Sequence, residues 1–505
     1  MQTVSINPLP PAAAPLAPFD AETCFRAYET RDERFDGRFF VAVRTTGIFC
    51  RPVCPARTPK RQNVEFHVSA AGAFAAGFRP CLRCRPERAP RGVGGAAPGA
   101  ALVARALTAI DSGALDDASL DRLAGWIGVS TRHLRRLFET HLGVAPLAVA
   151  QARRLMFARQ LIEETALPLT EVAFAAGFAS VRRFNSAIAA AYHATPGALR
   201  RPAAAKPPGA TAEARVSLRL GPLPVDGFAA LTAFYRARAF TGVETVEPGR
   251  YARTLSLGTR SGSFLVRHNG RDLILTSAFP DNARLPLIVA RVKRMFDLGA
   301  PLAAITSHLA CDPLLRPALG NIAPRVPCAW DPYELALRAV LGQQVSVAAA
   351  TTLAARLVER FGIVLEGGEG GLRLLFPPPE AIAAAAISDL TGLGIVRARA
   401  ACLIGLARHI AALPDWRQSY AGLDAFAADL TALPGIGPWT AQYVAMRGFG
   451  DPDAFPAADL GLLRAARSLG LAQTAGELQQ RALRWRPWRA YAAQALWNFN
   501  PKDAA

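Results

Sequence analysis

The chain contains 505 residues, with 58 Lys or Arg against 39 Asp or Glu, so its formal net charge at pH 7 is +19. A chain of this length accommodates about three or four domains, and its charge predicts a polyanionic partner, either nucleic acid or an acidic membrane surface. No uncharged apolar stretch reaches the roughly 18 residues of a membrane-spanning helix, so no transmembrane helix is expected.

Residues 1–20 lack the basic start of a signal peptide and predict a disordered leader. Four cysteines, Cys24, Cys311, Cys328 and Cys402, are scattered along the chain. Scattered cysteines are typical of reduced thiols, so we expect a cytoplasmic protein.

Two stretches of unusual composition divide the chain. Residues 86–100 and 201–214 are rich in Pro, Gly and Ala and have almost no large apolar side chains, which is typical of linkers. They separate a first domain, residues 20–88, from a second domain, residues 100–201, and from a C-terminal part that begins at residue 215.

The first domain shows strand periodicity. Apolar residues alternate with other residues over 39–43 and over 64–68, which predicts two strands. An Ala-rich helix is expected from about Ser69 onwards. The sequence therefore predicts a small α+β unit.

The same domain contains two closely spaced cysteine pairs, Cys50 with Cys54 and Cys81 with Cys84. Two such pairs can converge on one tetrahedral ion, and thiolate ligands favour Zn²⁺. We therefore expect one zinc ion held by four cysteines. Closed sites of this kind are mostly structural, so a structural zinc knuckle is the alternative for the bare cysteine pattern.

The sequences around these cysteines, TTGIFCRPVC and GFRPCLRC, resemble the N-terminal domain of the Ada methyltransferase family over roughly residues 20–88. The resemblance implies that Cys50 accepts a methyl group from a methylated DNA phosphate. It also implies that Thr46 and Arg57 contact DNA phosphates near the metal, although both could be ordinary surface residues. The chemistry is reasonable because a metal-bound sulfur stays a thiolate, and the thiolate is the nucleophile.

The second domain contains two similar helical halves. In the first half, a helical run over 119–124 is followed by a turn at 128–130, and Ser130 is placed to cap the next helix. The second half repeats this plan, with a helix over 169–176, a turn, and a helix over 181–192.

The second helix of each half is amphipathic. In the first half, apolar residues at 134, 137 and 138 share one face, and the basic residues largely occupy the other. In the second half, residues 184 and 188 are expected to face inward. The side chains left to reach outward are Arg132, Arg135, Arg136, Arg182 and Arg183.

Two helix-turn-helix units joined by a long helix, over about 146–165, resemble the DNA-binding domain of the AraC family, and residues 194–200 are typical of that family's end. The resemblance implies that the outward arginines contact DNA. Helical hairpins that only pack are the alternative. Each arginine could contact a phosphate or a guanine.

The C-terminal part lacks the Pro-Cys-His-Arg sequence that carries the nucleophile of a second Ada methyltransferase domain. Cys328 lies in Pro-Cys-Ala-Trp, without the His and Arg that would activate its sulfur. We interpret Cys328 as an ordinary buried thiol.

Residues 433–441, LPGIGPWTA, predict a helix-hairpin-helix turn. Gly435 and Gly437 would let backbone N–H groups point at a DNA phosphate next to a helix N-terminus. A simple tight turn is the alternative for this motif alone. Asp459 follows it at a short distance along the chain.

This pairing resembles the helix-hairpin-helix DNA glycosylases, and residues 215–500 resemble the AlkA alkyl-base glycosylases, with further matches at 243–246, 341–347 and 484–489. Cleavage of an N-glycosidic bond develops positive charge on the sugar, and the carboxylate of Asp459 is the candidate to stabilise it or to activate water. We expect the nearby Asp453 to be solvated.

The resemblance also predicts the type of glycosylase. Bifunctional relatives place a Schiff-base lysine where this chain has Trp439, and many carry an iron–sulfur loop of four cysteines, whereas no cysteine follows Cys402. We therefore expect a monofunctional enzyme that leaves an abasic site.

An alkylated purine carries positive charge, and electron-rich rings would hold it once it is flipped from the duplex. The resemblance assigns the wall of this base pocket to Phe234, Trp439, Tyr443 and Trp497, for which packing in the core is the alternative. Two positions depart from the family pattern. Gln344 replaces the leucine that wedges into the duplex, so DNA contact at Gln344 is expected with a different side chain, and Leu460 replaces a tyrosine.

Together these features predict a multidomain, mainly α protein. We expect an α+β zinc domain at 20–88, an all-α double helix-turn-helix domain at 100–201, a β-rich subdomain at 215–305 with strands near 251–257 and 272–276, and a helical glycosylase domain at 306–500.

The predicted function is that of a fused alkylation-damage protein, which transfers methyl groups from DNA phosphotriesters to Cys50, excises alkylated bases such as 3-methyladenine, and regulates transcription. Double-stranded DNA is the expected partner, RNA polymerase is expected as the partner of an activator, and no membrane is expected. The alternatives are a transcription activator with an inactive glycosylase fold, and a repair protein without a regulatory role.

Overall fold

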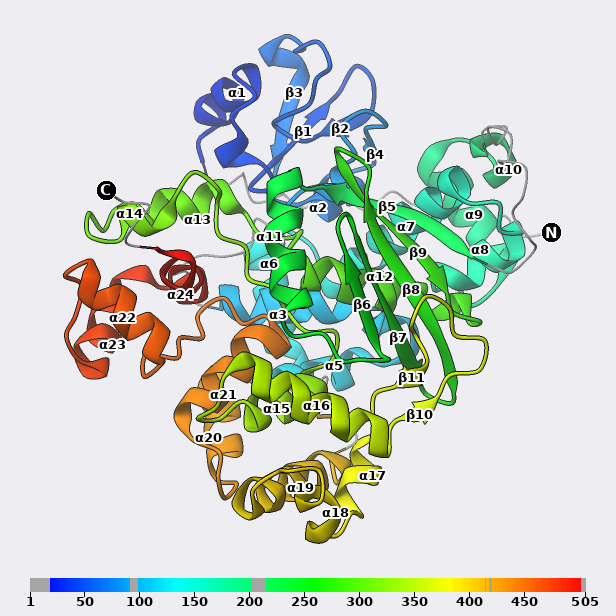
Figure 1. Ribbon diagram of the computed structural model, residues 1–505. Helices are drawn as coiled ribbons and strands as arrows, with labels where there is room; N and C mark the ends of the chain where they lie inside the picture. The colour runs from blue at the N-terminus through cyan, green and yellow to red at the C-terminus, as the bar shows by residue number, and fades with distance from the viewer. Residues whose placement is uncertain (1–18, 91–98, 201–214, 414, 417–419, 501–505) are drawn as a thin grey trace.

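A computed structural model of the protein describes residues 19–90, 99–200, 215–413, 415–416 and 420–500 (Figure 1). Most of the predicted leader and most of the two predicted linkers lie outside the described residues. None of the helices among the described residues combines the length and the apolar character that crossing a membrane requires.

The zinc domain is built on a four-stranded sheet with the order β3-β1-β2-β4. The strand predictions for 39–43 and 64–68 are confirmed as β1 and β3, and the predicted helix is confirmed as α2, which Ser69 caps by accepting a hydrogen bond from the backbone N–H of Gly72. The elements are α1 (Ala21–Glu29), η1 (Glu33–Phe35), β1 (Phe40–Val43), β2 (Ile48–Cys50), η2 (Arg61–Asn63), β3 (Val64–His67), α2 (Ala70–Ala75), β4 (Arg79–Pro80) and η3 (Pro86–Arg88).

The second domain is all-α and contains both predicted helix-turn-helix units. Ser130 and Ser180 cap α6 and α9 by accepting hydrogen bonds from the N–H groups of His133 and Arg183. Gly128 ends α5 with a φ of +79°, which a residue with a Cβ adopts only with strain. The helices are α3 (Ala100–Asp111), α4 (Ala114–Asp117), α5 (Leu120–Ile127), α6 (Thr131–Leu142), α7 (Pro146–Glu164), α8 (Leu169–Ala175), α9 (Val181–Tyr192) and α10 (Pro196–Leu199).

A five-stranded antiparallel sheet with the order β5-β9-β8-β7-β6 follows, and the strands expected near 251–257 and 272–276 are confirmed as β7 and β9. Its elements are β5 (Val216–Pro222), α11 (Val225–Arg236), β6 (Glu244–Glu247), β7 (Arg250–Leu257), β8 (Arg260–His268), β9 (Asp272–Ala278), η4 (Asn282–Arg284) and α12 (Leu285–Met295).

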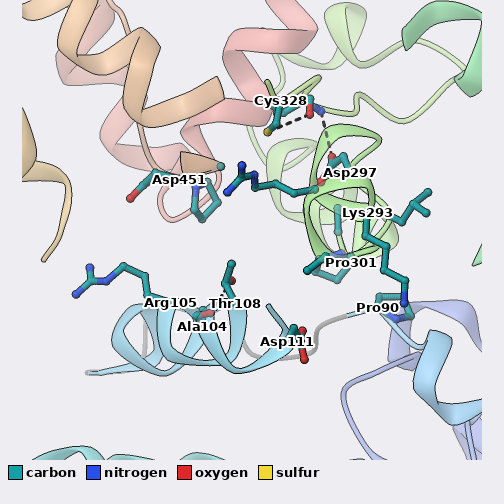
Figure 2. Close-up of a pocket in the computed structure, with 18 of the residues that line it drawn as sticks. Pro90, Ala104, Arg105, Thr108, Asp111, Lys293, Asp297, Pro301, Cys328 and Asp451 are labelled. Carbon is teal, nitrogen blue, oxygen red and sulfur yellow. Dashed lines mark hydrogen bonds between the residues drawn. The ribbon is translucent and has the colours of Figure 1, made fainter. Parts of the chain in front are cut away.

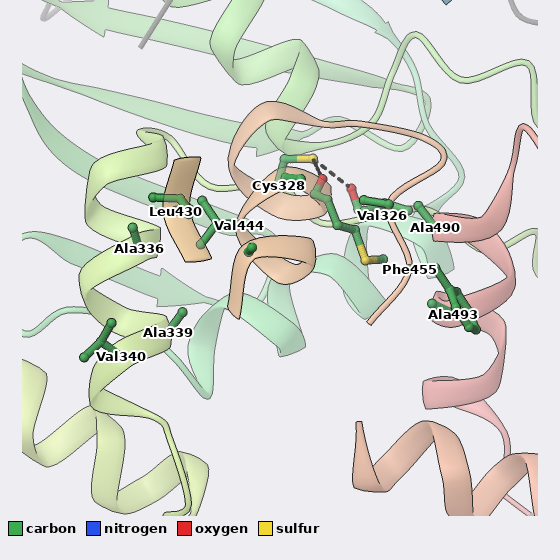
Figure 3. Close-up of a cluster of buried hydrophobic side chains, with 14 of the residues drawn as sticks. Val326, Cys328, Ala336, Ala339, Val340, Leu430, Val444, Phe455, Ala490 and Ala493 are labelled. Carbon is green, nitrogen blue, oxygen red and sulfur yellow. Dashed lines mark hydrogen bonds between the residues drawn. The ribbon is translucent and has the colours of Figure 1, made fainter. Parts of the chain in front are cut away.

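The rest of the chain is mainly helical, apart from the two short strands β10 and β11. A large core cluster joins α15, α21 and α24 (Figure 3). The elements are α13 (Leu302–Leu309), α14 (Arg316–Leu319), α15 (Pro332–Leu341), α16 (Val347–Phe361), β10 (Ile363–Val364), β11 (Leu374–Leu375), α17 (Pro379–Ala383), α18 (Ile387–Thr391), α19 (Arg397–Ala411), α20 (Leu423–Thr431), α21 (Pro438–Val444), the π-helical turn η5 (Ala445–Phe449), α22 (Leu460–Ser468), α23 (Ala475–Ala482), η6 (Leu483–Trp485) and α24 (Arg489–Asn498).

Cys328 lies inside this core, as predicted. Its thiol is 3.6 Å from the carbonyl oxygen of Val326 and 3.8 Å from that of Met446. Burial raises the pKa of Cys328 to about 12, so the sulfur stays protonated and unreactive at neutral pH.

The domains pack directly against one another. A single cluster of buried side chains joins α7, α8 and α9 of the helix-turn-helix domain to the five-stranded sheet. The buried guanidinium of Arg159 in α7 donates to the carbonyl oxygen of Pro80 in the zinc domain at 3.1 Å. Farther away, Arg105 of α3 donates to the carbonyl oxygen of Ala421 at 2.9 Å. The composition of the linkers gives no sign of these contacts.

A cavity of about 2050 Å³ lies where these domains meet (Figure 2). Arg105 and Thr108 of α3 line one side of it, and Asp297, Cys328 and Asp451 are among the residues of the other side. Neither of the two predicted catalytic residues lines the cavity, so the chemistry belongs elsewhere.

The sheet is fixed to the helical domain by a buried ion pair between Arg253 of β7 and Glu334 of α15, with both carboxylate oxygens 2.8 Å from one guanidinium nitrogen. We expect Glu334→Ala to destabilise the protein by about 3 kcal/mol, because it leaves the buried charge of Arg253 with only the more distant carboxylate of Glu244, at 3.6 Å. Denaturant unfolding would measure the change. Glu359→Ala removes one partner of an exposed pair with Arg373 and should leave the midpoint unchanged. Equal shifts for the two variants would contradict this account.

Candidate metal centre and candidate active site

Strand pairing brings the two cysteine pairs together. The strands β2 and β4 are parallel neighbours, with Phe49 opposite Pro80. Cys50 is the last residue of β2 and Cys81 directly follows β4, and the N–H of Cys81 donates to the carbonyl oxygen of Phe49 at 2.9 Å. Cys54 and Cys84 return from the turns that follow, so all four sulfurs reach one point.

The four Sγ atoms lie within 4.8 Å of one another, and all four side chains are buried. Sulfurs bound at about 2.3 Å to one tetrahedral ion lie roughly 3.8 Å apart, so this cluster suits one Zn²⁺. Two backbone N–H groups point at the sulfurs, from Arg51 to Cys84 at 3.3 Å and from Arg83 to Cys81 at 3.4 Å. Such donors stabilise thiolates.

The loop between Cys50 and Cys54 is held by an ion pair that the sequence did not reveal. The guanidinium of Arg51 pairs with the buried carboxylate of Asp36 and donates to the carbonyl oxygen of Cys84 at 3.2 Å. Arg51 thus fixes both halves of the cysteine cluster, and its charge is already neutralised.

The two predicted phosphate contacts lie on the surface of this domain. Thr46 occupies the exposed turn between β1 and β2, where its N–H donates to the carbonyl oxygen of Val43. Arg57 is exposed in the loop after Cys54. Both are accessible, and their contact with DNA stays a prediction.

The amphipathic faces predicted for α6 and α9 are present. Leu134 and Phe138 of α6, and Phe184 and Ile188 of α9, are completely buried. The arginines predicted to contact DNA are all exposed, namely Arg132, Arg135, Arg136, Arg182 and Arg183.

The helix-hairpin-helix turn joins α20 to α21. Gly435 has a φ of +87°, a backbone conformation that favours glycine, and a Cβ at this position would lie only 3.0 Å from Sγ of Cys402. Gly437 caps α21 with its backbone exposed to solvent. Gln343 was not predicted as a site residue, yet its side-chain amide donates to the carbonyl oxygen of Gly435 at 3.0 Å. Next to it, Gln344 is exposed with a φ of +56°.

The carboxylate of Asp459 accepts four hydrogen bonds. As the N-cap of α22, its Oδ1 accepts from the backbone N–H groups of Gly461 at 2.8 Å and Leu462 at 3.0 Å. The indole N–H of Trp497 donates to Oδ1, and that of Trp439 donates to Oδ2, each at 2.9 Å. These four donors fix the orientation of the carboxylate.

The four aromatic residues predicted for the base pocket lie together beside this carboxylate, and each is partly exposed. Trp439 stacks on Tyr443 with centroids 5.1 Å apart, and Tyr443 meets Trp497 edge-on at 6.3 Å. Phe234 comes from α11 of the sheet subdomain, and the guanidinium of Arg447 links it to Tyr443 and Trp497. Leu460, next to the carboxylate, is 75% exposed.

The prediction that Asp453 is solvated is wrong. Its carboxylate receives hydrogen bonds from Arg486 at 2.8 Å and from Arg489 at 2.8 and 2.9 Å. The loop of Asp453 folds back on the start of α24, a contact between residues distant in the sequence, so Asp453 has a structural role in holding α24 in place.

Comparison with known families accounts for most of the chain. Four family models match it, described as the metal binding domain of Ada at residues 23–87, a helix-turn-helix domain at 123–202, the AlkA N-terminal domain at 218–331, and the HhH-GPD superfamily base excision DNA repair protein at 337–490.

Curated relatives cover the same regions. The "Probable bifunctional transcriptional activator/DNA repair enzyme AlkA" of Mycobacterium tuberculosis is 42% identical over 95% of this chain and 96% of its own. The "DNA-3-methyladenine glycosylase 2" of Escherichia coli is 34% identical over 53% of this chain and 92% of its own. The "Bifunctional transcriptional activator/DNA repair enzyme Ada" of Escherichia coli is 43% identical over 27% of this chain and 36% of its own.

Among solved structures, the 3-methyladenine DNA-glycosylase of Archaeoglobus fulgidus aligns with 56% of this chain and 97% of its own, at a TM-score of 0.49 and 24% identity. The M. tuberculosis relative matches this chain nearly end to end, and the four family models all match this one chain. The chain therefore belongs to the family of bifunctional AlkA proteins, in which an Ada-type zinc domain and an AraC-type helix-turn-helix domain are fused to an AlkA-type glycosylase.

Proposed function

We propose that this protein repairs alkylated DNA by two separate reactions, methyl transfer to Cys50 and excision of alkylated bases at Asp459, and that it regulates transcription through its helix-turn-helix domain. The observation that supports the proposal is that one chain contains both reactive groups, Cys50 and Asp459, each held in position by its surroundings. The sulfurs converge on a metal-sized cluster, and the carboxylate of Asp459 is oriented beside an aromatic cluster.

In the first reaction, the thiolate of Cys50 attacks the methyl carbon of a DNA methylphosphotriester. A carbon–sulfur bond forms, the carbon–oxygen bond breaks, and its electron pair remains on the phosphate oxygen as an ordinary phosphodiester anion. Bound Zn²⁺ supplies the positive charge that keeps the four sulfurs deprotonated at neutral pH. A neutral triester approaches this anionic cluster without repulsion, whereas an intact phosphodiester is repelled.

In the second reaction, the carboxylate of Asp459 faces the sugar of a flipped nucleotide. The bond between C1′ and the base nitrogen breaks with its electron pair on the base, and the carboxylate stabilises the positive charge left on the sugar until water adds to C1′. Residues 306–500 contain no lysine at all, so the helical domain offers no amine for a Schiff base. A monofunctional glycosylase that leaves an abasic site follows from this composition.

DNA docking is assigned to three surfaces. Exposed arginines of α6 and α9 reach the promoter, Thr46 and Arg57 reach phosphates beside the zinc domain, and the hairpin of Gly435 and Gly437 with Gln344 reaches the damaged duplex. As an activator, the protein would contact RNA polymerase when bound at a promoter.

We expect Cys50→Ser to abolish methyl uptake from methylated DNA, because the hydroxyl is not deprotonated at neutral pH. Mass spectrometry of the wild-type protein should show a gain of about 14 Da, the mass of one CH₂, on Cys50 alone. Cys311→Ser is the matched control, since Cys311 is an exposed free thiol outside the cluster. Uptake that survives in Cys50→Ser would contradict the assignment.

Methylation of Cys50 should strengthen DNA binding, because it turns a thiolate into a neutral thioether and reduces the negative charge of the cluster next to the DNA phosphates. The affinities of methylated and unmethylated protein for the same duplex should be compared across a salt series. Tighter binding by the methylated form, with the difference shrinking as salt rises, is the expected result. Equal affinities at low salt would remove the switch and leave the methyl transfer intact.

Asp459→Asn should reduce the release of 3-methyladenine from alkylated DNA by about 100-fold or more, because the amide carries no negative charge to stabilise the sugar cation. Chromatography of the released base measures the effect. Asp429→Asn changes an exposed acid of α20 and serves as the control. If wild-type protein releases no base, the rival function, a transcription activator with an inactive glycosylase fold, replaces this one.

A further inference from the structure

A buried arginine occupies the centre of the aromatic cluster. Arg447 lies on the π-helical turn η5, directly after α21, and is 3% exposed. Its guanidinium carbon is 4.5 Å from the ring centroid of Phe234, 4.8 Å from that of Trp497 and 5.4 Å from that of Tyr443. Arg447 thus touches three of the four rings assigned to the base pocket. Turns of the π type inside helices are frequent at functional sites.

The charge of Arg447 is not neutralised by a carboxylate. Its two terminal nitrogens donate to the carbonyl oxygen of Pro327 at 3.0 Å and to Oε1 of Gln494 at 2.9 Å, which are neutral acceptors. Its Nε is buried without a partner, and within the described residues it forms no salt bridge. Burial lowers the pKa of Arg447 from its usual value, but arginine stays protonated at neutral pH. A permanent positive charge therefore lies next to the rings of Phe234, Tyr443 and Trp497.

A second guanidinium acts on the same ring. The guanidinium carbon of Arg238, which lies just beyond the end of α11, is 3.9 Å from the centroid of Phe234. Phe234 therefore already interacts with two cations. The attraction of a ring for a further cation is offset by repulsion from those already present, and the repulsion from the buried guanidinium of Arg447 is weakly screened.

The charge of the leaving base determines what this arrangement does. When the glycosidic bond breaks, its electron pair goes to the base, so a cationic alkylated base leaves as a neutral molecule, whereas a neutral base leaves with negative charge until it is protonated by water. A buried positive charge near the base repels a cationic base while it is still bound to the sugar. The same charge stabilises the negative charge that develops on a neutral base as it leaves.

We propose that Arg447 sets the charge preference of the base pocket, reducing the advantage of cationic bases and promoting excision of neutral ones, with Arg238 acting in the same direction. This inference depends on the proposed glycosylase function and on its base pocket. Arg447 acts through charge and through the rings, as a specificity-determining residue.

The test compares two duplexes that differ in one base, hypoxanthine as a neutral base and 7-methylguanine as a cationic base. Rates are measured in single turnovers with the enzyme well below saturation, so that they include binding of the base as well as bond cleavage, and alkaline cleavage reveals the abasic product. In Arg447→Met, the ratio of the rate on hypoxanthine to the rate on 7-methylguanine should fall about tenfold relative to wild type. Arg447→Lys keeps the charge and should restore much of the ratio. Loss of packing alone would lower both rates together.

Arg481→Met provides a matched control, because Arg481 is an arginine of the same domain that pairs with Asp312 and has no contact with the four rings. It should leave the ratio unchanged. If Arg447→Met does not fold, Arg238→Met should shift the ratio in the same direction by a smaller factor.

The possible outcomes distinguish a failure of the proposed glycosylase function from a failure of the inference about Arg447. Wild-type protein that excises neither base contradicts the proposed glycosylase function itself. Wild-type protein that excises 7-methylguanine but no hypoxanthine overturns only the inference, as does an unchanged ratio in both Arg447→Met and Arg238→Met.

Discussion

Four hydrogen bonds to one carboxylate determine how the helical domain presents its chemistry. The backbone of α22 and the indoles of Trp439 and Trp497 all donate to Asp459, so α21, α22 and α24 must keep their relative positions for the carboxylate to be held. Two nearby contacts help to hold these helices in position. Asp453 anchors α24, and Gln343 holds the hairpin that precedes α21. The carboxylate is thereby preorganised for a positive charge that develops on the sugar.

Much of the fold and of the candidate sites could be predicted from the sequence, because short stretches of neighbouring residues encode them. The cysteine spacing, the serine caps of α6 and α9, and the Gly435 turn are each encoded by a few neighbouring residues whose conformational demands are specific. The amphipathic faces of α6 and α9 followed from helical periodicity in the same way.

The features that were missed depend on partners far apart in the chain. The carboxylate of Asp453 forms ion pairs with Arg486 and Arg489, and Arg51 forms an ion pair with Asp36. No local sequence pattern predicts these ion pairs. Arg447 follows an ordinary helical stretch, and only the folded chain shows that rings from α11, α21 and α24 surround it. Sequence resemblance identified the rings as candidates but gave no sign of the cation among them.

The domains are also more closely joined than their linkers suggest. Helix α7 contacts the zinc domain through Arg159 and the five-stranded sheet through Gln160, whose side-chain amide donates to the carbonyl oxygen of Arg219 at 2.7 Å. The glycosylase part therefore shares a hydrophobic core with the DNA-binding part.

In the proposed excision reaction, one carboxylate breaks the bond between sugar and base without the help of a lysine. The decisive experiment is product analysis after incubation of the purified protein with alkylated duplex DNA. We expect free 3-methyladenine, an intact strand with an abasic site, and no covalent adduct after borohydride treatment. Strand cleavage with a trapped adduct, or alkylated DNA from which no base is released, would contradict it.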